Sequence, residues 1–153
     1  MRNRLGLIAL ALWLATAAVV AFVFIHGHTA PGSDGRTALL LQTGERDFVL
    51  AEMRSLLTAD RAITAALAAG DAAQVATAAR AVGMAEAHDR APALLAKLPL
   101  DFKRLAMALH GGFDDLAAAA EAGEPMLALN ARLIEQLDRC IACHESFRID
   151  VAP

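Results

Sequence analysis

Residues 125–149 read PMLALNARLIEQLDRCIACHESFRI, and the interpretation of the whole chain starts from this stretch. Its apolar side chains recur at steps of three and four residues, which places them on one face of a helix. These residues are Met126, Leu129, Leu133, Leu137 and Cys140. Pro125 suits the start of such a helix, because the N–H groups of a first helical turn have no partner within the helix. The stretch therefore predicts an amphipathic helix that buries the face carrying Cys140.

Three further segments before residue 125 show the same helical periodicity. We expect them to run from about 45 to 69, from 71 to 97 with a break near Pro92, and from 99 to 122. Gly70 and Gly123 are candidate C-caps, and Asp71 is a candidate N-cap. Short loops make sequential helices antiparallel. The sequence therefore predicts an all-α fold with an antiparallel up-down-up-down four-helix bundle over residues 45–149.

The N-terminal segment is apolar enough to enter a membrane. Residues 5–25 carry no charge, and a helix of that length spans roughly 30 Å, the hydrocarbon thickness of a bilayer. The apolar core of a cleaved signal peptide is usually shorter, so residues 1–25 are interpreted first as a transmembrane anchor and second as a signal sequence. Arg2 and Arg4 favour a cytoplasmic N-terminus. In a Gram-negative bacterium this predicts a single-pass inner-membrane protein with a periplasmic C-terminal domain, or a soluble periplasmic protein after cleavage.

Residues 26–44 are polar and rich in turn-forming residues, which predicts a linker. Within it, residues 37–42 could extend the following helix backward. His26 and His28 are expected to be solvated at the membrane surface rather than to bind a metal. The 153-residue chain has a net charge of -3 and no run of Lys or Arg, which excludes a basic surface for nucleic acid.

The only two cysteines form the motif Cys140-Ile-Ala-Cys143-His144. A C-x-x-C-H sequence is typical of covalent c-type haem attachment. On a helix the three side chains share a face, so that two thiols can add to the vinyl groups of one porphyrin. The imidazole of His144 then lies beneath the ring and can bind the iron.

Two other interpretations of the cysteine pair are less consistent with the sequence. A redox-active dithiol usually begins a helix in an α/β unit, and no strand pattern is found here. A structural zinc ion needs four ligands, and nothing in the spacing of His88 and His110 suggests that they complete a site. The sequence therefore predicts one haem c bound through Cys140, Cys143 and His144.

The last helix resembles that of the cytochrome c′ family, because an aromatic residue, Phe147, and then Arg148 follow the C-x-x-C-H motif. The first helix resembles the family through Arg46, with Leu50 four positions on and Met53 seven positions on. The similarity covers residues 45–149. It is strong in the last helix and moderate in the first, whereas the middle helices match only in length and pattern and lack a long connecting loop.

The resemblance implies a role for each matching residue. His144 would be an axial ligand, and Arg148 would lie near the exposed haem edge. Leu50 would cover the distal face, and Arg46 would approach a propionate. In low-spin relatives a Met of the first helix is the sixth ligand, but here Leu50 aligns with that Met and Met53 lies one turn later. Five-coordinate iron and iron bound by Met53 therefore both remain open.

His110 lies beside two glycines, Gly111 and Gly112. Glycine destabilises a helix interior by about 1 kcal/mol relative to Ala, so a close approach of the backbone to the haem would explain the pair. His110 could then contact a propionate or the iron. The preferred expectation is a surface histidine with Asp114 at i+4.

These features predict an electron carrier at the periplasmic face of the membrane, with redox proteins as partners. The alternative is a five-coordinate haem protein that binds a small gas such as nitric oxide. An enzyme is disfavoured because no distal acid–base pair is found. A subunit of a larger membrane complex is also compatible with the anchor, and the family resemblance allows a homodimer.

Overall fold

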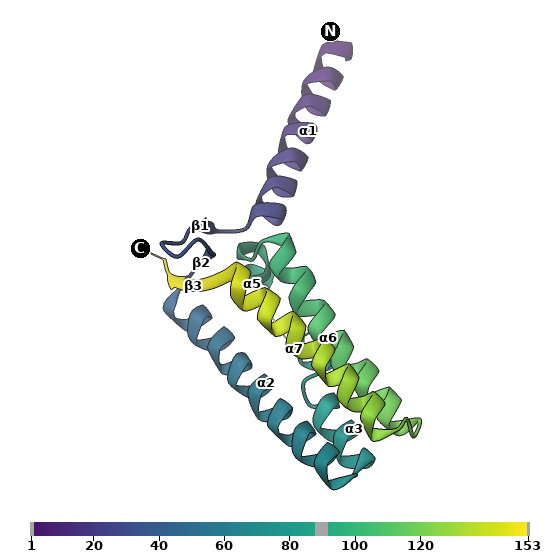
Figure 1. Cartoon of the computed structure of the whole chain (residues 1–153). Coiled ribbons are helices and arrows are strands. Elements are labelled where there is room, and N and C mark those ends of the chain that lie inside the picture. Colours follow the sequence, from purple (N-terminus) through teal and green to yellow (C-terminus); the bar gives the residue numbers. More distant parts are fainter. Residues whose placement is uncertain (1, 88–91, 153) are drawn as a thin grey trace.

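The computed structural model describes residues 2–87 and 92–152, and most of them are helical (Figure 1). The elements are α1 (Arg2–His26), β1 (Thr29–Pro31), β2 (Thr37–Leu41), α2 (Thr43–Ala69), α3 (Ala72–Arg80), α4 (Met84–Ala87), α5 (Pro92–Lys97), α6 (Leu100–Glu121), α7 (Met126–Ser146) and β3 (Phe147–Val151). Figure 1 shows α1 projecting from an elongated domain that contains all the other elements.

The expected N-terminal apolar helix is confirmed. The segment Arg4–His26 contains an 18-residue window with a mean hydropathy of 2.7, and none of that window is buried in the domain. By length and composition α1 can cross a membrane or act as a signal sequence.

Local signals placed several helix ends correctly. Gly70 follows α2 in the left-handed conformation, with φ 71°, and Gly123 adopts φ 77° after α6. The Asp71 side chain accepts a hydrogen bond of 3.0 Å from the backbone N–H of Gln74 and so caps α3. Glu45 accepts one of 2.9 Å from the backbone N–H of Gln42, which completes a capping box at the start of α2.

The prediction that the segment 71–97 is one helix with a break near Pro92 is wrong in part: α5 does begin at Pro92, but the chain also leaves the helical path earlier, after Arg80. The described part of this segment forms the shorter helices α3, α4 and α5. The chain leaves α3 at Ala81, and the Asp114 carboxylate of α6 then accepts a hydrogen bond of 2.8 Å from the backbone N–H of Met84. This contact caps a new helix instead of continuing the old one. His88 lies outside the described residues.

The prediction that the fold is purely helical is also wrong, because the described residues contain a three-stranded sheet in the order β1-β2-β3. β1 pairs antiparallel with β2, and β2 pairs parallel with β3. Residues 26–44 are therefore not a plain linker, and residues 37–42 do not extend α2. The last helix ends at Ser146 rather than at residue 149. Burial of apolar side chains favours the strand over a helix here: Leu39 and Leu41 of β2 are completely inaccessible to solvent.

Two apolar clusters form the core of the described residues. One joins α2, α3, α6 and α7 around Ile63, Val75, Leu116 and Leu129. The other, beneath the sheet, joins β2 to α2, α5 and α6 and includes Leu39 and Phe102. Among the four longer domain helices, α2 packs on α3, α3 on α6 and α6 on α7, whereas the contact between α2 and α7 is sparse.

The sheet is predicted to be essential for stability. Leu39→Ala should lower the free energy of unfolding by about 2–5 kcal/mol, because it leaves a cavity under β2. Leu127 is 82% exposed, so Leu127→Ala should change it by less than about 0.5 kcal/mol. Urea unfolding of the detergent-solubilised chain, followed by circular dichroism, measures both values. Equal effects of the two substitutions would contradict the structural importance of the sheet.

Candidate functional site

The last two turns of α7 bring Cys140, Cys143 and His144 together, as their spacing predicted. Both cysteines carry free thiols and are partly buried. The His144 residue is exposed, yet it lines a cavity in the domain. The three side chains therefore lie where the surface of α7 passes into the interior.

An apolar cavity of about 270 Å³ adjoins these residues. It lies among α2, α5, α6 and α7, next to the sparse contact between α2 and α7. Aliphatic and aromatic side chains form most of its wall, among them Val49, Met53, Leu98, Phe102, Leu109 and Phe113. A cavity of this kind can take the apolar body of a ligand.

A second cavity of about 350 Å³ has a charged wall. It shares Met53, Phe102, Cys143 and His144 with the first cavity, so the two adjoin. Its remaining wall includes three arginines, Arg36, Arg46 and Arg148. The first cavity is thus apolar, the second has three arginines and Asp150 in its wall, and His144 lines both.

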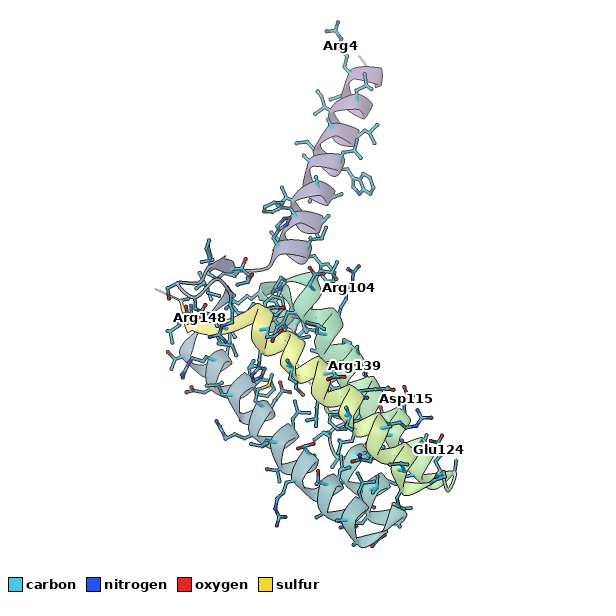
Figure 2. The ribbon with its side chains drawn as sticks, in the orientation of Figure 1. Arg4, Arg104, Asp115, Glu124, Arg139 and Arg148 are labelled. Carbon is cyan, nitrogen blue, oxygen red and sulfur yellow. The ribbon has the colours of Figure 1, made fainter. Side chains whose placement is uncertain are left out.

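All seven predicted site residues line one or both cavities. Cys140 lines the first; Arg46, Leu50 and Arg148 line the second; Met53, Cys143 and His144 line both. The prediction that the last helix continues through Arg148 is wrong, since Arg148 belongs to β3. Arg148 lines the second cavity from β3, and Figure 2 shows it just beyond the end of α7.

Hydrogen bonds orient Arg148 in β3, just after the end of α7. Arg148 donates to Asp150 Oδ1 over 3.0 Å and to Ser33 Oγ over 3.3 Å. It also lies 3.4 Å from Asp34 Oδ2. These contacts fix the guanidinium beside the second cavity, although ion pairs as exposed as these contribute little to stability.

Arg36 is a site residue that sequence reasoning missed. Its Nη1 donates to the backbone carbonyl of His144 over 3.1 Å, and its Nη2 lies 2.6 Å from Asp34 Oδ2. Hydrogen bonds from Arg36 lower the pKa of Asp34 to about 2, so the pair stays ionised down to strongly acidic pH. No local pattern marks Arg36, because its position depends on the pairing of β2 with β3.

The expectation that His110 lies at the surface is wrong. His110 is buried, its Nδ1 lies 2.8 Å from the carbonyl oxygen of Val82, and it lines the apolar cavity. Asp114, its expected partner, instead accepts the hydrogen bond from Met84 described above. A side chain at Gly112 would meet the ends of Gln136 and Arg139, so this glycine accommodates α7.

A second residue that sequence reasoning missed is Asp60. Its Oδ1 is buried and accepts no hydrogen bond from the described residues, and the residue lines the apolar cavity. Burial, and then the charge of Asp60, raise the pKa of the Cys140 thiol. The helical periodicity of α2 gave no signal for an inward-facing carboxylate.

The two thiols lack the lowered pKa that is typical of a redox-active cysteine. Burial raises the pKa of Cys143 to about 11, whereas reactive cysteines have lowered pKa values. Among the described residues, no three or more His, Cys, Asp or Glu side chains gather as ligands for a metal ion. The site therefore consists of two partly buried thiols with raised pKa values and an imidazole, all beside an apolar cavity.

Comparisons of the chain with models of protein families, with curated proteins and with solved structures found no match. The interpretation of the site therefore rests on its own residues and geometry.

The raised thiol pKa predicts slow alkylation. In a folded chain without haem, iodoacetamide at pH 8 should modify Cys143 about a hundredfold more slowly than in urea, because two pKa units reduce the thiolate a hundredfold. Mass spectrometry of the Cys143 peptide gives both rates, and circular dichroism checks the helix content. An added cysteine at exposed Ala122 should react equally fast in both states. Fast modification of folded Cys143 would favour a redox dithiol.

Proposed function

We propose that this chain binds one haem covalently through Cys140 and Cys143, with His144 as an axial ligand, and transfers electrons at the outer face of a membrane. The observation that carries the proposal is the C-x-x-C-H motif beside two adjoining cavities: Cys140 lines the first, and Cys143 and His144 line both. When bound, the haem would supply a one-electron ferric/ferrous couple.

The two cavities suit the two halves of a haem. The macrocycle and its vinyl groups are apolar and match the first cavity, where Cys140 and Cys143 lie. The two propionates are anionic and match the cationic second cavity, where Arg46 and Arg148 lie. Arg36 is a third arginine in the wall of this cavity, in addition to Arg46 and Arg148.

Each group of side chains has a distinct task in this proposal. Cys140 and Cys143 fasten the cofactor by thioether bonds, and His144 binds the iron. Arg36 restrains the backbone of His144 through its carbonyl group. Leu98 and Phe102 exclude water from the cavity wall. A rigid apolar wall needs little rearrangement when the charge of the iron changes.

The fold is compatible with the predicted bundle. In this proposal α2, α3, α6 and α7 are the four antiparallel helices of a cytochrome c′-like domain, and α4 and α5 replace the end of its second helix. α1 would be a single-pass anchor in the inner membrane of a bacterium, with the domain in the periplasm. Membrane-associated redox proteins would be the partners, and a homodimer is compatible with the resemblance.

Met53 is the candidate sixth ligand, because it lines both cavities together with His144, whereas Leu50 lines only the second. If Met53 does not bind the iron, the apolar first cavity favours a second function, the binding of nitric oxide by five-coordinate haem. The two functions differ in spin state, which an optical spectrum measures.

Covalent attachment is predicted to depend on the cysteine pair. Produced in a host with haem-attachment machinery, the chain should stain for haem after denaturing electrophoresis. Replacing Cys140 and Cys143 together by Ala should abolish the stain, whereas Met107→Ala should retain it, since Met107 lines neither cavity. A colourless chain with two free thiols would refute the proposed function.

The sixth ligand is predicted to depend on Met53. Met53→Ala should convert a low-spin spectrum to a high-spin one and remove the sulfur–iron charge-transfer band, whereas Met107→Ala should leave both features unchanged. A high-spin wild-type spectrum that changes when nitric oxide is added would instead support gas binding. An unchanged low-spin spectrum in Met53→Ala would exclude Met53 as a ligand.

A further inference from the structure

The base of α1 is packed against the domain rather than joined to it by a free linker. Just after the helix, the backbone N–H of His28 donates to the carbonyl oxygen of Lys97 over 2.7 Å. Gly27 adopts φ 63°, and a side chain at this position would overlap the backbone of Lys97 and Leu98. The chain thus passes so close to the turn between α5 and α6 that only a glycine fits there.

A lysine of α6 makes a second contact with α1. Lys103 Nζ donates to the carbonyl oxygen of Phe24 over 2.7 Å and lies 3.5 Å from the centre of its ring. Partial burial of the Lys103 amine lowers its pKa. The end of α1 therefore contacts two neighbouring parts of the domain, which restricts its direction.

The sheet connects the same junction to the candidate site. β1 begins at Thr29, three residues after α1, and pairs with β2, which pairs with β3 directly after α7. Figure 1 shows the base of α1, the sheet and the end of α7 at one end of the domain. In Figure 2, Arg104 lies near this end and Glu124 at the opposite end.

From these contacts we infer that the end of the domain carrying His144 faces a lipid surface, with the mouth of the second cavity near the headgroups. This inference rests on the proposed insertion of α1 in a membrane, and it does not depend on haem. An electron partner then approaches the site along the membrane plane, whereas the turn between α6 and α7 points to bulk water.

Photo-crosslinking to lipid tests this orientation. The full-length chain, reconstituted in phosphatidylcholine vesicles, carries p-benzoylphenylalanine in place of Trp13, Arg104 or Ala122, one position at a time. Arg104 and Ala122 are both exposed and lie at opposite ends of α6, so they are matched probes. Trp13 lies in the middle of α1 and reports insertion of the anchor itself. Mass spectrometry measures the yield of lipid adduct.

The expected result is a high yield at Trp13 and at least tenfold more adduct at Arg104 than at Ala122. Equal yields at Arg104 and Ala122, with a high yield at Trp13, would overturn the orientation and leave the anchor intact. A negligible yield at Trp13 would overturn both the insertion of α1 in the membrane and the orientation of the domain. Insertion of eight Gly and Ser residues after Gly27 should reduce the yield at Arg104, and an unchanged yield would show that the junction does not orient the domain.

Discussion

The parallel pairing of β2 with β3 is the contact on which the candidate site depends. It joins residues close to α1 with the residues that directly follow His144. Leu39 of β2 is completely buried, so apolar contacts beneath the sheet strengthen the hydrogen-bonded ladder. Because of this pairing, Arg36 and Arg148 reach the same cavity from opposite parts of the chain.

The apolar cavity has its own structural cause. α3 is rich in alanine, and its buried Ala76 and Ala79 let it approach α6 closely. α2 and α7 carry larger side chains and make sparse contact with each other. The interior is therefore closed on the α3 side and remains hollow beside the cysteines, where a planar apolar group would complete the packing.

Sequence reasoning found the features that local patterns encode. Apolar periodicity placed α2, α6 and α7, glycine and aspartate placed the caps beside Gly70, and adjacent residues define the C-x-x-C-H motif. It missed β2 and β3 because a strand pairing between distant residues leaves no periodic signal in either short segment. Arg36 was missed for the same reason. The positions of Asp60 and His110 were missed because one polar residue on a helix does not reveal which way it faces.

The buried thiols set the order in which such a protein matures. Cys143, with its pKa near 11, is almost entirely protonated at neutral pH once α7 has packed. A thiol in this state reacts slowly and is hard for another protein to reach. In the proposed haem protein, thioether formation would therefore precede the docking of α7, because the thiols are partly buried once that helix has packed. The cofactor would then be attached while the chain is still folding, and not inserted into a domain that has already folded.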